Sequence, residues 1–198
     1  TTATRMRVRD CSATHRDDSM SGRPAVLLDR DNTIIVNDGD LGDPEGVSLM
    51  PGAEAALARL HAANWPLIVI TNQGGVARGR YDEDAVRSVH TRIQTLLKDT
   101  PILDWLWCPW HPHGTVPEYT REHPWRKPSP GMLLEAASRH GLSLADSWMV
   151  GDQDRDIAAG QAAQCHTILL SETPGTPAAE RTVGTITEAV DHILASTQ

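Results

Sequence analysis

The sequence predicts an α/β fold built on a mostly parallel sheet. Two observations predict it: short apolar runs typical of strands buried on both faces recur along the chain, and stretches with helical periodicity separate them. Strands that alternate with helices in this way form βαβ units, which place helices on both faces of a sheet. We therefore expect a Rossmann-like, three-layer αβα sandwich.

The first half of the chain shows this alternation. The apolar run at 25–28 is the first predicted strand. A helical pattern begins at Pro51, since proline suits the first turn of a helix. The run at 67–70 is the second strand, and apolar residues at 3.6-residue spacing predict a helix at 82–98. The segment 103–108 is a third strand candidate.

The second half repeats the alternation after an irregular stretch at 109–130 that is rich in proline, histidine and tryptophan. Its predicted elements are a helix at 132–140, a strand at 148–151, a helix at 157–163, a strand at 167–170 and a helix at 186–194. Residues 1–24 are polar and show no period, so we expect a flexible N-terminal arm followed by one domain at 25–198. No stretch is long enough for a large cap domain.

Composition and charge narrow the partners. Lys and Arg total 18 against 26 Asp and Glu, and the formal charge of −8 argues against a nucleic-acid binder. No apolar run approaches the roughly 18 residues that cross a bilayer, and the N-terminus carries no apolar signal segment. Three widely spaced cysteines without a CxxC pair fit a reducing compartment. We therefore expect a cytoplasmic monomer that binds neither nucleic acid nor membrane and acts on a small molecule.

Polar side chains follow the predicted strands at the point where each strand ends. Asp29 and Asp31 come after the first strand and, being two residues apart, face the same side of an extended segment. Two carboxylates so close together favour a hard divalent cation such as Mg²⁺. Taken alone, a D-x-D pair is also typical of a solvated acidic turn.

The second predicted strand ends in residues that can bind an anion without adding charge. Thr71 offers a hydroxyl, and Asn72 and Gln73 offer amides. Gly74 would let the backbone approach a ligand. A capping threonine followed by a turn would use the same residues, so this motif decides nothing by itself.

Two charged clusters complete the set. Lys127 lies in the proline-rich loop before the third predicted helix and could offset charge on a phosphoryl group. Asp152 follows the fourth predicted strand, and Asp156 lies four residues on, on the same face of a following helix. A third carboxylate would complete an oxygen shell for Mg²⁺. Acidic residues that complement a helix dipole are the alternative interpretation for one of the three.

The order of these clusters resembles the haloacid dehalogenase superfamily of phosphoryl-transfer enzymes: strand and DxDxT, strand and Thr, loop and Lys, strand and GDxxxD. The resemblance runs from about Ala25 to Leu170. Longer matches are similar to the family that holds the D,D-heptose 1,7-bisphosphate phosphatases and the histidinol phosphatases, and are nearer to the heptose enzymes. These matches span residues 29–34, 51–53, 71–79, 108–109, 126–132 and 151–152.

The resemblance implies a Mg²⁺-dependent phosphatase that acts on a sugar phosphate, foremost the 7-phosphate of D-glycero-D-manno-heptose 1,7-bisphosphate. It assigns Asp29 as the nucleophile that forms an aspartyl phosphate and Asp31 as the general acid and base. Thr71 and Lys127 would hold the phosphoryl group. Mg²⁺ would bind Asp29, the backbone carbonyl of Asp31, and Asp152.

The resemblance also implies substrate contacts. The matching positions are Asn37, Asp38, Gly39, Asp40, Asn72, Gln73, Gly74 and Arg126. Asp156 matches a residue that supports the site without binding the metal. Gln153 stands where relatives often have lysine, which leaves the recognition of a second phosphate open.

The zinc loop of the family is matched only in part. Heptose bisphosphate phosphatases of this type usually bind a structural zinc through C-x-H and C-x-C, and here Cys108 matches the first ligand while Trp110 replaces the histidine. Zn²⁺ could still bind to a substitute set made of Cys108, His111, His113 and His123. The favoured interpretation is that zinc is lost and that tryptophans pack the loop, because a structural site needs all four ligands.

Alternatives remain. The substrate could be histidinol phosphate or the phosphate ester of another small molecule. The chain could also be a signalling receiver domain or a phosphate-binding scaffold without activity. A receiver domain places its phospho-acceptor after the third strand, where Cys108 stands here. All four catalytic elements are intact, which argues against a scaffold.

Overall fold

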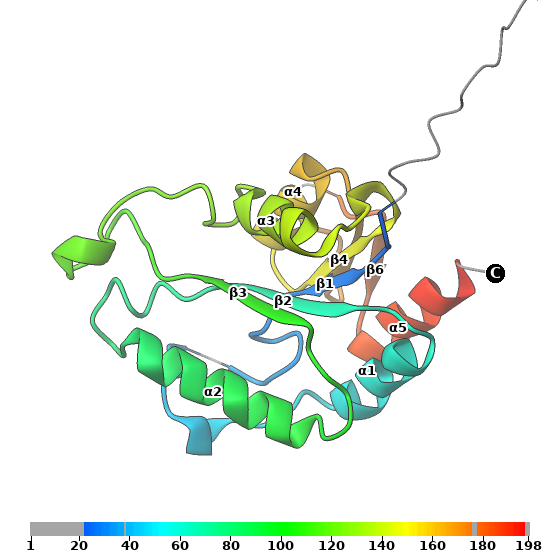
Figure 1. Ribbon diagram of the computed structural model, residues 1–198, viewed down its shortest axis with the longest axis horizontal. Helices are drawn as coiled ribbons and strands as arrows, with labels where there is room; N and C mark the ends of the chain where they lie inside the picture. The colour runs from blue at the N-terminus through cyan, green and yellow to red at the C-terminus, as the bar shows by residue number, and fades with distance from the viewer. Residues whose placement is uncertain (1–21, 38, 176–177, 197–198) are drawn as a thin grey trace, which may run out of the picture.

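The computed structural model describes residues 22–37, 39–175 and 178–196, and in them six strands form one sheet (Figure 1). Every neighbouring pair of strands is parallel, and the order across the sheet is β3-β2-β1-β4-β5-β6. The strands are β1 (Val26–Leu28), β2 (Leu67–Asn72), β3 (Asp104–Cys108), β4 (Trp148–Gly151), β5 (His166–Leu170) and β6 (Arg181–Val183). The predicted parallel α/β sheet is confirmed.

Helices cover both faces of this sheet (Figure 1). One face carries α1 (Ala53–Ala62), α2 (Glu83–Leu96) and α5 (Ile186–Ala195), and the other carries α3 (Gly131–His140) and α4 (Asp154–Ala162). Because strand side chains alternate between faces, Leu27 packs on the α3 side while Val26 and Leu28 pack on the α1 side. This two-sided burial explains the continuous apolar runs of the sequence. No helix in the described ranges is long and apolar enough to span a bilayer.

The chain changes its direction across the sheet between β1 and β4. The path from β1 through β2 to β3 builds one half, and the path from β4 through β5 to β6 builds the other. In open parallel sheets, ligands bind at such a switch point, beyond the carboxyl ends of the strands. Asp29 lies there, and its N–H donates to the carbonyl oxygen of Val150 at 2.9 Å, so the ends of β1 and β4 lie side by side.

Two elements differ from the prediction. β6 was not predicted, because Arg181–Val183 is a three-residue edge strand without a continuous apolar run. α4 begins at Asp154, three residues earlier than predicted, because the side chain of Asp156 accepts a hydrogen bond from the N–H of Gln153 (3.0 Å) and caps the helix. Within the predicted arm, residues 1–21 lie outside the described residues, while the N–H of Arg23 donates to the carbonyl oxygen of Gly141 at 3.0 Å.

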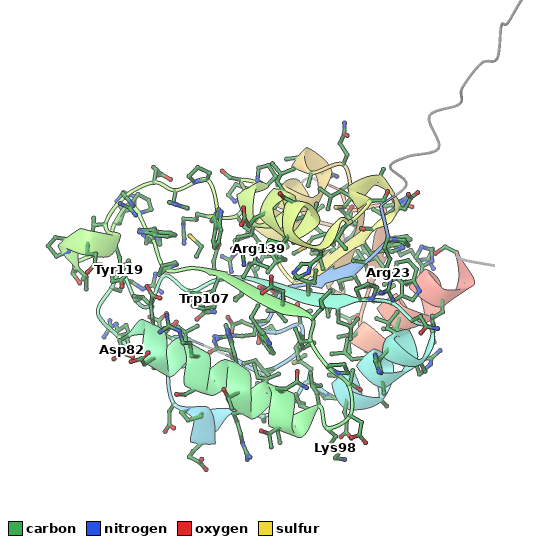
Figure 2. All side chains as sticks on the ribbon, viewed as in Figure 1. Arg23, Asp82, Lys98, Trp107, Tyr119 and Arg139 are labelled. Atoms are coloured by element: carbon green, nitrogen blue, oxygen red, sulfur yellow. The ribbon has the colours of Figure 1, made fainter. Side chains whose placement is uncertain are left out.

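The 109–130 loop extends past the β3 edge of the sheet. Figure 2 shows Tyr119 at its far end, on the same side of the molecule as Asp82 at the start of α2. The Tyr119 hydroxyl donates to Glu83 Oε1 at 3.0 Å, so the loop is tied to the first turn of α2. The rest of the loop returns toward the carboxyl ends of the strands and brings Lys127 to the switch point.

Candidate active site

A buried ion-pair cluster lies where β1 and β4 end. Lys127 Nζ lies 2.8 Å from Asp29 Oδ1 and 2.7 Å from Asp156 Oδ1, and it donates to the carbonyl oxygen of Ile70 at 2.7 Å. The contacts with Asp29 and Ile70 are hydrogen bonds, and the contact with Asp156 is an ion pair. Only 2–3% of Lys127 and Asp29 is exposed, and Asp156 is fully buried. One lysine therefore compensates two carboxylates that have lost their hydration.

Charges in this cluster influence one another. Burial raises the pKa of Asp29 to about 6 against the attraction of Lys127, and Asp156 and Asp31 raise it further. Burial by itself lowers the pKa of Lys127, but Asp156 and Asp29 outweigh that effect and the net direction is upward. Lys127 therefore stays charged, and a further cation beside Asp29 would favour the ionised carboxylate.

Asn72 and Gly151 shape the cluster without joining it. Asn72 Nδ2 donates to the carbonyl oxygen of Lys127, and the N–H of Lys127 donates to Asn72 Oδ1, both at 3.0 Å. This pair of bonds fastens the loop to the end of β2. At Gly151 a Cβ atom would lie 2.5 Å from the carboxylate of Asp156, so only glycine lets that carboxylate pack against β4.

Three carboxylates at this edge could hold a cation. One oxygen from each of Asp29, Asp152 and Asp156 lies within 4.8 Å of the others. The oxygens of Asp156 already contact Lys127 and the N–H of Gln153, so Asp156 braces the lysine. Asp152 is half-buried, and burial raises its pKa, with Asp29 adding to the effect. Hard oxygen donors with excess negative charge suit Mg²⁺, and Asp29 and Asp152 fit that ion.

Asp31 lies at the rim of the cluster, and 22% of its side chain is exposed. It accepts hydrogen bonds from Arg30 Nη2 (3.0 Å), Asn37 Nδ2 (2.7 Å) and Gln73 Nε2 (2.9 Å). Gln73 Nε2 also donates to Thr71 Oγ1 at 2.9 Å. The hydroxyl hydrogen of the buried Thr71 is thereby left for another acceptor, such as a phosphoryl oxygen.

A polar cleft of about 190 Å³ opens beside these groups. It contains Asp31 and Asp152, together with the predicted substrate contacts Asn37, Gly39, Asp40, Asn72, Gln73, Gly74 and Arg126. Asp38 lies outside the described residues. The cleft adds Arg78, Tyr81 and Arg155, which the sequence did not single out. A larger hollow of about 670 Å³ beside β6 and α5 contains none of the predicted site residues.

The four candidate zinc ligands do not gather. Among the described residues, no three of Cys108, His111, His113 and His123 bring ligand atoms within 4.8 Å of one another. Instead, Trp110 stacks on His123 with ring centres 3.8 Å apart, and the guanidinium of Arg121 lies 4.9 Å from the Trp110 ring. Aromatic and cation–π contacts thus order this part of the loop.

Comparison with known proteins gives the chain its relatives. A family model described as HAD-hydrolase-like matches residues 124–196. A D-glycero-beta-D-manno-heptose-1,7-bisphosphate 7-phosphatase of Rhodopseudomonas palustris is 41% identical over 143 residues, which cover 71% of this chain and 79% of that one. The enzyme of that name from Escherichia coli K12 is 38% identical over 161 residues, which cover 79% and 84%.

Solved structures agree with these relatives. A HAD-like phosphatase of Mesorhizobium loti superposes with a TM-score of 0.78 at 35% identity, over 89% of this chain and 86% of that one. The D,D-heptose 1,7-bisphosphate phosphatase of B. bronchiseptica, complexed with magnesium and phosphate, gives a TM-score of 0.76 at 26% identity, over 87% and 99%.

Proposed function

This chain belongs to the haloacid dehalogenase-like phosphatases, among the heptose-1,7-bisphosphate 7-phosphatases, and from this premise we propose that it removes the 7-phosphate of D-glycero-D-manno-heptose 1,7-bisphosphate. One observation carries the proposal. Lys127 binds Asp29 in the interior, and Asp152, which lines the cleft, brings a carboxylate oxygen within 4.8 Å of one of Asp29. A fixed carboxylate with positive charge next to it is what in-line transfer of a phosphoryl group requires.

Two proton transfers accompany the proposed reaction. A carboxylate oxygen of Asp29 attacks phosphorus, and the bond from phosphorus to the sugar oxygen breaks while protonated Asp31 gives its proton to that oxygen. Asp31 then takes a proton from water as the water oxygen attacks phosphorus. The bond between phosphorus and Asp29 breaks, inorganic phosphate leaves, and both carboxyl groups return to their starting states.

The remaining groups hold charge in place. Lys127 fixes Asp29 and acts on the phosphoryl group through its charge, since it donates to Asp29 and to the Ile70 carbonyl and forms an ion pair with Asp156. The Thr71 hydroxyl would donate to a phosphoryl oxygen. Mg²⁺ would be held by Asp29, Asp152 and the backbone carbonyl of Asp31, and would supply positive charge that offsets the repulsion between carboxylate and phosphate. The magnesium and phosphate of the B. bronchiseptica relative support this part of the proposal.

Three guanidinium groups in the cleft support a substrate with a second phosphate. They belong to Arg78, Arg126 and Arg155. Arg78 Nη2 is paired with Asp40 Oδ1 at 2.5 Å. Burial lowers the pKa of Arg126, and Arg155 and Arg78 lower it further by repulsion. Positive groups that repel one another favour an anion between them and disfavour a cationic substrate such as histidinol phosphate.

Phosphate release from a substrate panel tests the proposal. With Mg²⁺ we expect the highest kcat/KM on heptose 1,7-bisphosphate, below it fructose 1,6-bisphosphate and histidinol phosphate. Activity should vanish on chelation and in Asp29→Asn, while the exposed control Asp99→Asn keeps it. A higher kcat/KM on histidinol phosphate would overturn the substrate, and full activity of Asp29→Asn would overturn the mechanism. Size-exclusion chromatography of the same preparation checks the expected monomer.

A further inference from the structure

The side-chain amide of Gln73 forms all of its hydrogen bonds with groups of the protein. It is 1% exposed, at the turn after β2. Arg30 Nη2 and the Tyr81 hydroxyl donate to Gln73 Oε1 at 2.9 and 2.8 Å. Gln73 Nε2 donates to Asp31 Oδ2 and to Thr71 Oγ1, both at 2.9 Å. A primary amide has two acceptor sites and two N–H donors, so none is left for a substrate.

Tyr81 and Arg30 fix which way this amide points. A guanidinium only donates, so the amide atom that faces Arg30 must be the oxygen. Burial raises the pKa of Tyr81 to about 12, so its hydroxyl stays protonated at neutral pH and can donate to the same oxygen. The NH₂ group of Gln73 is therefore directed at Asp31 and Thr71.

Two glycines seat the Tyr81 ring against the backbone. A Cβ atom built on Gly75 would lie 2.4 Å from Tyr81 Cζ, and one built on Gly42 would lie 2.5 Å from Tyr81 Cβ. Any larger residue at either position would push the ring away from Gln73. The two glycines thus leave space for the Tyr81 ring, whose hydroxyl donates to Gln73.

Arg30 binds the Asp31 carboxylate next to Gln73, because its Nη2 atom also donates to Gln73 Oε1. Its Nε and Nη2 atoms lie 3.2 and 3.0 Å from Asp31 Oδ1, and Nη2 lies 3.2 Å from Asp31 Oδ2. Arg30 is fully buried, so its guanidinium cannot follow a rotation of the carboxylate into the cleft. Arg30 and Gln73 together set the direction of the Asp31 carboxylate.

We propose that Gln73, oriented by Tyr81, is a positioning residue for Asp31 and not a contact to the substrate. The inference rests on the proposed function, because it concerns the acid–base step of that reaction. Binding a substrate through Gln73 would break at least one of the four hydrogen bonds that its buried amide makes inside the protein. The geometry therefore replaces the substrate contact that the family resemblance implies at this position.

Two substrates with different leaving groups distinguish a positioning role of Gln73 from substrate binding and from an effect on folding. A sugar alkoxide needs the proton of Asp31 as it departs, whereas 4-nitrophenolate departs without one. Gln73→Met keeps the length of the side chain and removes its hydrogen bonds. We expect its kcat on the sugar phosphate to fall about 10- to 100-fold with KM unchanged, and its kcat/KM on 4-nitrophenyl phosphate to fall less than about threefold. Tyr81→Phe should show the same selectivity with a smaller loss, about threefold.

The chain's other tyrosine provides the matched control. Tyr119→Phe removes a hydroxyl bonded to Glu83 outside the cleft and should change neither substrate. In an Asp31→Asn background, Gln73→Met should add no further loss on the sugar phosphate, because the group it positions is already gone.

Three results would overturn the inference. Equal losses on both phosphates would indicate that Gln73 acts through Thr71 or through the fold alone, and a raised KM on the sugar phosphate with unchanged kcat would indicate a substrate contact. A wild-type protein that hydrolyses neither phosphate would refute the proposed function itself, and the inference with it. Should Gln73→Met fail to fold, Tyr81→Phe against Tyr119→Phe decides by the same criteria.

Discussion

The two carboxylates that the proposed reaction needs are held in different ways. Asp29 is buried and paired by Lys127 inside the protein, whereas Asp31 lies at the rim of the cleft and is held by Arg30 and by neutral amides. A nucleophile attacks from one direction, so fixed ion pairs suit it. A general acid and base must serve a leaving group and then a water molecule, so it needs access to solvent. Substitutions that break the buried pair of Asp29 and Lys127 should therefore lower both stability and rate, whereas substitutions of Asp31 should lower mainly the rate.

A substitution of Asp31 tests the carboxylate at the rim of the cleft. Asp31→Asn keeps an oxygen that accepts from Arg30 but cannot deliver a proton, so kcat on the sugar phosphate should fall about 10²- to 10⁴-fold. Steady-state phosphate release measures the rate, and urea unfolding measures the accompanying change in stability. A loss below tenfold would remove Asp31 from the acid–base role.

Removing the lysine tests the buried half. Lys127→Met leaves Asp29 and Asp156 in the interior without their cation, so the free energy of unfolding should fall by about 3–5 kcal/mol, more than in Asp31→Asn. Activity should be lost with it. Urea unfolding against Lys98→Met, which removes an exposed lysine paired with Glu54, makes the comparison. Equal losses of unfolding free energy in the two lysine variants would contradict the view that Lys127 stabilises buried carboxylates.

The pH dependence of stability sharpens the comparison further. Burial raises the pKa of Asp29 to about 6 in the folded protein, so between about pH 4 and pH 6 the folded protein keeps a proton that the unfolded chain releases. That stabilisation is complete below the unfolded pKa and is lost as the pH rises through 6. We therefore compare the free energy of unfolding of Asp29→Asn with that of the wild type in the absence of Mg²⁺. The difference, variant minus wild type, should rise by up to about 3 kcal/mol on going from pH 4 to pH 7.

Urea unfolding at a series of pH values in chelator measures that gain. Mg²⁺ at pH 7 should narrow the gap, because the cation favours the ionised carboxylate of the wild type. A difference that stays constant with pH, or that shrinks on going from pH 4 to pH 7, would show that Asp29 is not the buried, proton-binding group described here.

Sequence order predicts positions at the strand ends well, because parallel strands carry their last residues to one edge. Asp29 and Asp152 are candidates on that ground, and they lie together in the structure. Lys127 is a candidate through its place in the order of the motifs, and its loop brings it to Asp29. Gln73 shows what order leaves out. Its place after β2 follows from the sequence, but the direction of its amide depends on Tyr81 and on a buried arginine.

The features that sequence analysis missed share a physical cause. Tyr81 stands outside every motif, and its only signal is a pair of distant glycines, Gly42 and Gly75, that make room for its ring. β6 has three residues at a sheet edge, so it has no apolar run to reveal it. Tryptophan packing in the 109–130 loop was predicted, but not that Trp110 would stack on His123, because the loop has no periodicity. Each depends on contacts between segments that local patterns do not encode.

A phosphoryl group on Asp29 is the most direct test of the account. Asp31→Asn can still be phosphorylated by 4-nitrophenyl phosphate, whose leaving group needs no proton, but it lacks the base that activates water for the second step. After acid quench and peptide mapping by mass spectrometry, the account predicts one phosphoryl group on the peptide that contains residue 29, and none in the double variant Asp29→Asn/Asp31→Asn. A phosphoryl group on another residue, or an unmodified Asp31→Asn protein during turnover, would contradict it.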